Sequence, residues 1–258
     1  MILCVFEGER DRCVFDTLIR LFFKHKERQV LCCYNSNIYS LYKKCCEYES
    51  GCDIVAILRE MYETRDDNPF SDDIANSDIA EVFLFFDIDF HDSRFSVEEK
   101  IEKLDFMLNL FNDETDMGKL YVSYPMLEAL RYTKYLPDAD FYKYKILVDE
   151  CVKFKGIAND FSDYASDFLE LNFEKEIKKE KYNEVRDNWN LLKEQNVKKA
   201  NWICCGENVM PLAKGLISQD KILINQIEKF IKPKNTIAIL AAFPIFLYEY
   251  FKYSFMLN

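Results

Sequence analysis

The chain has 258 residues, 49% of them hydrophobic, with only six glycines and six prolines, which excludes a disordered polypeptide and provides for one large domain or a standard domain with an appendage. Its net charge is −11, and residues 60–99 account for all of it, with thirteen acidic residues against two arginines. From residue 136 onward, eighteen acidic and eighteen basic residues balance. Because nucleic-acid binders are usually basic, this distribution argues against a chain that binds DNA or RNA tightly by itself.

Cysteine usage and hydropathy indicate the cellular setting. Three pairs among the ten cysteines are adjacent in sequence: Cys32-Cys33, Cys45-Cys46 and Cys204-Cys205. None has the C-x-x-C spacing of a zinc knuckle, so we expect buried, reduced thiols in a cytoplasmic protein. The N-terminal apolar run is too short for a signal peptide. The longest uncharged run, 235–248, is shorter than the about 20 residues that span a bilayer, so we expect a buried helix and no membrane contact.

Four short apolar runs alternate with helical periodicity over the first 130 residues. The runs cover residues 2–6, 29–33, 82–86 and 119–123. Each has the length of a strand that is buried on both faces. Residues 37–63 and 97–111 repeat apolar side chains at helical spacing, whereas residues 65–78 form a polar, acidic loop. This alternation predicts an α/β fold, in which a parallel sheet is flanked by helices.

The second half of the chain has helical periodicity almost throughout. The predicted helices cover residues 141–155, 161–173, 174–195, 209–218, 221–230 and the final apolar segment. We expect a domain boundary near residue 135, with residues 1–135 as the sheet domain and residues 136–258 as a mostly helical C-terminal region. The alternative is a helical half that packs directly on the sheet as one unit.

Acidic residues follow the first and third predicted strands. Glu7 and Glu9 come just after the first strand, Asp87 and Asp89 just after the third, and Asp92 lies in the adjoining loop. In a parallel sheet, ligands bind at the carboxyl ends of the strands. Carboxylates gathered there repel one another unless a cation neutralises them, and all-oxygen sites suit Mg²⁺ or Mn²⁺. The pattern therefore predicts a metal site built from these five residues.

The strand–Glu7-Gly8-Glu9–helix unit, followed by a strand that ends in Asp87-Ile88-Asp89, resembles the TOPRIM domain of topoisomerases, bacterial primases and OLD-family nucleases. That family has a Glu, usually followed by Gly, after its first strand and a D-x-D after a later one. The resemblance covers residues 1–135. It implies that the two aspartates hold Mg²⁺ and that Glu7 acts as an acid/base or as a second metal ligand, in a Mg²⁺-dependent endonuclease.

A closer resemblance extends over most of the chain. Residues 83–89, 122–128 and 240–247 are similar to the small TOPRIM effectors of bacterial antiphage systems of the PARIS type. This implies a toxic nuclease of abortive infection that an ABC-type ATPase partner holds and that cuts nucleic acid, with transfer RNA as one substrate. RNA or DNA as the substrate, and a homo-oligomer, both stay open. The chain departs from many TOPRIM proteins after the D-x-D, where bulky Phe90 and His91 replace a glycine.

Simpler interpretations of the same residues stay open. The segment 7–9 is compatible with an ordinary strand-to-helix turn, in which Gly8 supplies an unusual backbone angle and Asp11 caps the helix. A catalytically inactive, acidic interaction module that docks a basic partner is the first functional alternative. The second is a haloacid-dehalogenase-like phosphatase with Asp87 as nucleophile and Asp89 as acid, although that family places its D-x-D after the first strand.

A few other side chains are candidates for secondary roles. Glu128 is either a further ligand or a carboxylate at a helix N-terminus, and His91 is either a proton shuttle or incidental. Tyr142 and Tyr144, beside lysines, are candidates for base stacking, with burial in the core as the simpler interpretation. The lysines of 175–199 alternate with glutamates, which is typical of a solvated helix face. The chain lacks a G-x-x-x-x-G-K-[ST] loop, so gating by a nucleotide requires a partner.

Overall fold

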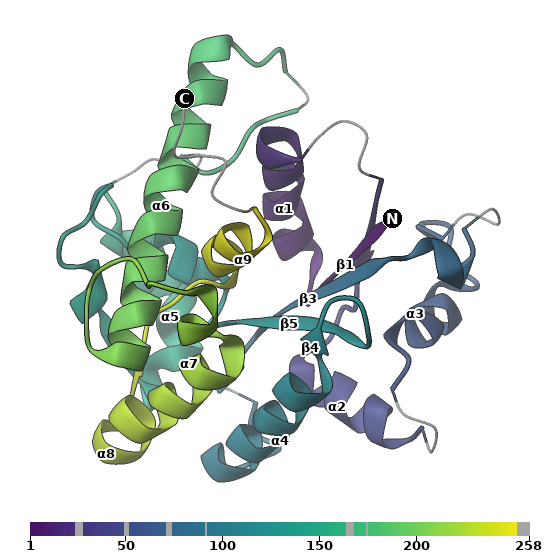
Figure 1. Cartoon of the computed structure of the whole chain (residues 1–258), viewed down its shortest axis with the longest axis horizontal. Coiled ribbons are helices and arrows are strands. Elements are labelled where there is room, and N and C mark those ends of the chain that lie inside the picture. The colour runs from purple at the N-terminus through teal and green to yellow at the C-terminus, as the bar shows by residue number, and fades with distance from the viewer. Residues whose placement is uncertain are drawn as a thin grey trace. The chain divides into compact units, whose positions relative to one another are not determined.

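A computed structural model describes residues 1–23, 28–48, 52–70, 74–90, 92–163, 168–173 and 175–251. The chain divides into two compact units, which we describe separately (Figure 1). The sheet unit comprises Met1–Asp87 and Phe95–Tyr121, and the helical unit comprises Ile88–Arg94 and Val122–Asn258. This division by contacts differs from the expected boundary near residue 135.

The sheet unit is built around a five-stranded, mostly parallel sheet, which confirms the predicted α/β class. Its elements are β1 Ile2–Phe6, α1 Glu9–Phe22, β2 Gln29–Cys33, α2 Ile38–Cys46, α3 Ile54–Tyr62, the 3-10 turn η1 Asn76–Asp78, β3 Glu81–Asp87, α4 Val97–Leu110, β4 Asn112–Asp113 and β5 Gly118–Ser123, whose last two residues belong to the helical unit. The strand order is β2-β1-β3-β5-β4. β1 pairs in parallel with both β2 and β3. All four predicted strands are present.

The apolar runs form strands because the sheet is covered on both faces. Every residue of β1 is buried. Phe6 is the register partner of Phe85, and an aromatic row continues from Phe6 through Phe85 to Tyr121, with ring centroids 5.6 Å apart at each step. Phe15 of α1 packs on this row, 5.1 Å from Phe6. Since β2 and β3 lie on either side of β1, right-handed crossovers place α1 and the α2–α3 segment on opposite faces of the sheet (Figure 1).

The helical unit is less regular than its sequence predicts. Its elements are η2 Leu127–Arg131, η3 Phe141–Lys143, β6 Lys145–Leu147, η4 Val148–Lys153, α5 Phe154–Phe161, α6 Lys179–Cys205, η5 Lys214–Ile217, α7 Gln219–Gln226, the π-turn η6 Ile227–Ile231, α8 Lys232–Lys234, β7 Thr236–Ala238 and α9 Ala242–Tyr250. The prediction of a helix over 141–155 is wrong, because β6 pairs antiparallel with β7 there. The predicted helix over 161–173 is also wrong, since only Phe161 of it is helical among the described residues.

The core of the helical unit lies between α6 and α9. Trp189 and Leu192 of α6 and Phe243 and Phe246 of α9 are all buried. The apolar segment near the end of the chain forms α9 and is buried from Ala242 to Tyr248, in agreement with the buried helix expected within residues 235–248. Among the described residues, no helix has the length and apolar character needed to cross a membrane.

The cysteines differ from the expectation of uniformly buried, reduced thiols. Cys45, in the last turn of α2, forms a disulfide with Cys52, which precedes α3, and their Cα atoms are 4.6 Å apart. Cys13, Cys46 and Cys205 are exposed. The expectation is wrong for Cys45 because the short connection after α2 returns Cys52 to the helix end.

Candidate functional site

The carboxyl ends of β1 and β3 lie side by side in the sheet. The chain runs from β1 outward to β2 on one side, and β3 and β5 follow on the other side of β1. The junction of β1 and β3 is therefore the topological switch point of the sheet. In open α/β sheets, ligands bind in the crevice outside the strand ends at such a point.

Glu7 and Asp87 meet at this switch point. The backbone amide of Glu7 donates to the carbonyl of Phe85 at 3.0 Å, which extends the β1–β3 ladder by one residue. In return, the amide of Asp87 donates to Oε2 of Glu7 at 3.0 Å. Both side chains are half-buried. The Glu7 carboxylate is thus held against the end of β3 by a hydrogen bond to main chain, a contact between residues 80 positions apart.

Gly8 does not supply an unusual backbone angle. Its φ of −151° and ψ of 179° are extended values that any residue adopts. Gly8 is the N-cap of α1 without a side-chain cap, and Asp11 is buried in the first turn, where it does not serve as the cap. The position of Glu7 is therefore set by the end of the β1–β3 ladder and not by a special conformation of Gly8. The space beside Gly8 is open, since a Cβ at this position would have no neighbouring atom within 4 Å.

Glu9 has different partners from Glu7. Both of its carboxylate oxygens accept from Nε of Arg12 at 3.0 Å, and Cys33 Sγ donates to Oε2 at 3.4 Å. The pKa of Glu9 is lowered, chiefly by the hydrogen bond from Arg12. Burial and the contact with Glu9 raise the pKa of Cys33 to about 12. Glu9 would have to leave Arg12 to bind a cation. Sequence reasoning missed Arg12, although its spacing of three residues from Glu9 on one helix is the signal that reveals such a pair.

Asp89 and Asp92 belong to the segment Ile88–Arg94, which groups with the helical unit. Asp89 is buried and has a φ of +48°, a left-handed conformation that aspartate tolerates better than most residues. Asp92 forms an ion pair with Arg94, with 2.6 Å between Oδ2 and Nη2. The placement of these two aspartates close to Glu7 stays a prediction, and His91 lies outside the described residues.

The residues at the switch point provide only the smallest set of protein ligands with which a magnesium ion is usually bound. Mg²⁺ usually takes one or two protein carboxylates and completes its shell with water and substrate phosphate. Glu7 and Asp87 supply two carboxylates on neighbouring strands. Within the described part of the chain, no group of three or more His, Cys, Asp or Glu side chains is arranged to hold a metal ion. Within the sheet unit, a cation there would rest on Glu7 and Asp87.

Other candidates from the sequence have structural surroundings. Glu128 lies in η2 of the helical unit, with Oε1 3.8 Å from Nζ of Lys155. Tyr144 is half-buried and its hydroxyl donates to Asp138 at 2.8 Å, whereas Tyr142 lines a pocket.

No family model, no curated protein and no solved structure matches the chain.

Proposed function

We propose that this chain is a metal-dependent nuclease of the TOPRIM type that hydrolyses phosphodiester bonds. The observation that carries the proposal is the hydrogen bond between the Glu7 carboxylate and the Asp87 amide at the carboxyl ends of β1 and β3. It joins the two acidic motifs of the sequence at the point of the sheet where α/β proteins bind ligands.

In this proposal, Asp87 and Asp89 bind the cation, Mg²⁺ or Mn²⁺, and Glu7 acts beside them. A bound divalent ion polarises the phosphate and activates a water molecule. The Asp87 amide donates to Oε2 of Glu7 and so holds the carboxylate against the end of β3. Glu9 and Asp92 contribute less, because each already forms an ion pair with an arginine.

The test is a Glu7→Gln variant. Glutamine keeps an oxygen that accepts from the Asp87 amide, so the fold should persist, while the charge and the base are lost. We expect cleavage of total RNA or plasmid in Mg²⁺ to fall by about 100-fold or more, the usual contribution of a general acid or base. Glu102→Gln is the matched control, since Glu102 in α4 is exposed in the same unit and lies outside the acidic stretches at issue. Circular dichroism checks folding. A folded Glu7→Gln variant that cleaves as well as the parent would remove Glu7 from the site.

The antiphage role adds a partner to the proposal: an ABC-type ATPase that keeps the nuclease in check. Its support is the acidic surface of the sheet unit, where Glu63, Asp66, Asp67 and Asp78 are exposed. Such a surface repels nucleic acid and attracts a basic protein.

Charge reversal tests this partner surface. Reversal at Asp66, Asp67, Asp72 and Asp73, of which the last two lie outside the described residues, should weaken capture of the ATPase from the native host and remove its salt dependence. Reversal of the exposed Asp220 and Glu228 in the helical unit is the control. A pull-down that recovers only this chain, with nuclease activity constant in the isolated protein, contradicts the proposal.

A catalytically inactive acidic module is the second candidate. The Glu9–Arg12 and Asp92–Arg94 pairs favour it, because they neutralise two of the five carboxylates without any metal. Incubation of the chain, alone and with its genomic neighbour's product, separates the two functions: cleavage that EDTA abolishes indicates the nuclease, and partner binding without cleavage indicates the module.

A further inference from the structure

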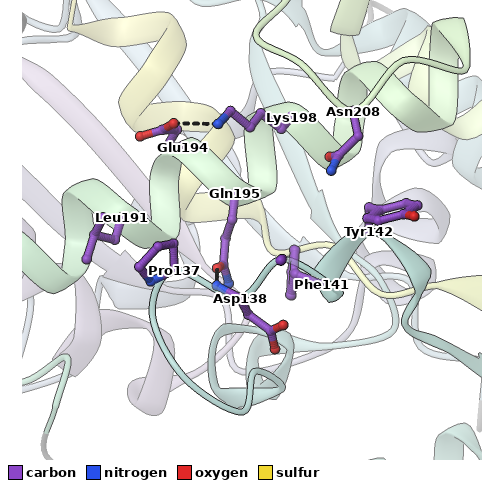
Figure 2. A pocket seen from close by; sticks show the side chains of 10 residues that line it. Pro137, Asp138, Phe141, Tyr142, Leu191, Glu194, Gln195, Lys198 and Asn208 are labelled. Atoms are coloured by element: carbon purple, nitrogen blue, oxygen red, sulfur yellow. Dashed lines mark hydrogen bonds and ion pairs between the residues drawn. The ribbon is translucent and has the colours of Figure 1, made fainter.

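The helical unit contains a pocket between the segment 137–142 and one face of α6 (Figure 2). Its volume is about 190 Å³. Figure 2 shows Pro137 and Leu191 at one end and Tyr142 and Asn208 at the other. Sites for drug-sized ligands usually measure about 300–1,000 Å³, so this pocket has room for one planar ring system.

The wall of the pocket is held in place by buried polar contacts. The amide of Asp138 donates to Oε1 of Gln195 at 3.2 Å, and Nε2 of Gln195 donates to Thr133 at 3.2 Å. Fully buried Lys199 donates to the carbonyls of Phe141 at 3.0 Å and of Tyr144 at 2.7 Å. These contacts fix the chain on both sides of residue 142. The wall is therefore already ordered before a ligand binds, so that binding loses little conformational entropy of the protein.

Tyr142 is the aromatic side chain that this wall presents. It is half-buried, and its ring lies edge-on to Trp202, with centroids 5.5 Å apart and an interplanar angle of 72°. Tyr144, two residues later, is unavailable because its ring packs against Phe161 at 5.1 Å. The pocket thus has one aromatic side chain that is partly open to solvent and braced by a second ring.

The polar groups at the rim match a nucleotide. Asn208 is exposed and carries an amide that both donates and accepts hydrogen bonds. Lys198 lies at the rim, 2.6 Å from Glu194, and supplies an ammonium group for a phosphate. An aromatic face, an amide and a nearby cation are the groups that proteins use to hold an unstacked base.

We propose that this pocket binds one unstacked nucleobase of a single-stranded nucleic acid, and this rests on the proposed nuclease function. An arginine side chain of a protein partner fits less well, because the carboxylate of Asp138 is not available to it. The exposed Lys198–Glu194 pair at the rim can open equally for a phosphate or for an arginine, so it does not distinguish the two ligands. Asp138 accepts from the Tyr144 hydroxyl and from the amides of Lys134 and Asp140. The pocket would position the strand through a base, while the phosphate chemistry takes place elsewhere.

Binding to a labelled ten-nucleotide RNA of mixed sequence, in EDTA so that no cleavage occurs, tests the proposal with the full chain. We expect Tyr142→Ala to weaken binding by about ten-fold or more, the usual effect of losing one stacking contact, and Tyr142→Phe to change it by less than about three-fold. Asn208→Ala should weaken it to a lesser degree. Adenosine monophosphate should quench Trp202 fluorescence in the parent, and the change should be absent in Trp202→Phe. Thermal melting shows whether each variant is folded.

Two results would overturn the pocket assignment. One is a folded Tyr142→Ala variant that binds the RNA as tightly as the parent. The other is quenching of Trp202 by an arginine-rich peptide with none by RNA or adenosine monophosphate, which would indicate a protein partner. Neither depends on cleavage. A Glu7→Gln variant that binds RNA normally but does not cut it leaves both proposals standing, and RNA binding without any Mg²⁺-dependent cleavage ends the nuclease proposal alone.

Discussion

The sheet unit and the helical unit provide hydrogen-bond partners for their buried backbone amides and carbonyls in different ways. Of the thirteen buried polar or charged residues that the structure describes, three lie in the sheet unit: Asp11, Thr17 and Lys100. The other ten lie in the helical unit. A parallel sheet pairs its own amides and carbonyls along the ladder, so its interior needs few polar side chains. Short strands and 3-10 turns leave such groups open, and side chains must reach them.

The helical unit provides those side chains from α6 and α7. Asn196 accepts from the amide of Ala241 at 3.0 Å. Gln226 donates to the carbonyl of Ala238 at 2.7 Å and accepts from its amide at 3.0 Å. A buried ionisable side chain such as Lys199 is therefore explained by its hydrogen bonds to backbone carbonyls alone. Glu7 also contacts backbone, since it accepts from the Asp87 amide, but it lies at the topological switch point of an otherwise apolar sheet. This position is why the strand ends are the better place to look for chemistry.

The largest expected effect is the loss of an aromatic ring from the sheet unit. Phe85 is 1% exposed and contacts Phe6, Phe15 and Tyr121. Phe85→Ala should lower the free energy of unfolding by about 3–5 kcal/mol, as for other buried phenylalanines. Phe106→Ala, at a position 46% exposed, should cost less than about 1 kcal/mol. Urea unfolding measures both, and equal losses would show that the aromatic row is not the core.

The next effect concerns Lys199. Its replacement by Met leaves the carbonyls of Phe141 and Tyr144 without their donor, so we expect a loss of about 1–3 kcal/mol at pH 7. Burial lowers the pKa of Lys199 well below its ordinary value. At pH values between the folded and the unfolded pKa of Lys199, the unfolded chain binds more protons than the folded chain. The free energy of unfolding of the parent, relative to that of the Met variant, should therefore rise with pH until the pH reaches the unfolded pKa of about 10.4.

Parallel melts of Lys199→Met and Lys198→Met across pH 7–10 check this sign. Lys198 is the control because it is partly exposed and paired with Glu194. A deficit of the Lys199 variant that shrinks as the pH rises would show that the folded state stabilises the charged lysine.

Two glycines should respond with opposite sign. Gly118 at the start of β5 has a φ of +118°, and a Cβ there would lie 2.8 Å from Cδ1 of Leu84. Gly118→Ala should therefore destabilise the sheet unit by about 1–3 kcal/mol. Gly156 lies within α5, and a Cβ at this position would have no neighbouring atom within 4 Å. Gly156→Ala should therefore raise the free energy of unfolding by about 0.5–1 kcal/mol. Thermal unfolding measures both, and a neutral Gly118→Ala would show that β3 adjusts easily.

The sequence predicts the sheet unit better than the helical unit. The long strands of the sheet have a local sequence pattern, whereas the short strands of the helical unit do not. An apolar run of five residues, such as Ile2–Phe6, has the length and composition of a strand covered on both faces, and β1 has those bounds. β6 and β7 are only three residues long each and exist because they pair with one another. Local periodicity carries no information on such a pairing, so the segment 141–155 was predicted as a helix.

Some features of the candidate site could be predicted from the sequence, and others could not. The approach of Glu7 to Asp87 depends on the strand order β2-β1-β3. The alternation of strands and helices predicts a parallel sheet but does not say which strands are neighbours. The pairing of Asp92 with Arg94, and the left-handed conformation of Asp89, depend on how the chain turns after β3. The pocket beside Tyr142 depends on Lys199 and Gln195, which lie on the inward face of α6 among apolar residues. Polar side chains at such positions are a sequence signal for buried networks, but their partners lie about 55 residues away.

The smallest effect is expected at the surface of the sheet unit, where Arg12 lowers the pKa of Glu9. Arg12→Gln should raise that pKa toward its ordinary value, which NMR titration of the Glu9 carboxyl measures. Because the folded pKa is lowered, the pair stabilises the protein at neutral pH, and this contribution disappears as the pH falls through the folded value. The side chain of Glu9 is 60% exposed and that of Arg12 is 38% exposed, so solvent screening limits the contribution to less than about 1 kcal/mol. Arg20→Gln, in the last turn of α1, is the control. If Arg12→Gln leaves the Glu9 pKa unchanged, the pair does not persist in solution, and Glu9 then becomes available to a cation beside Glu7.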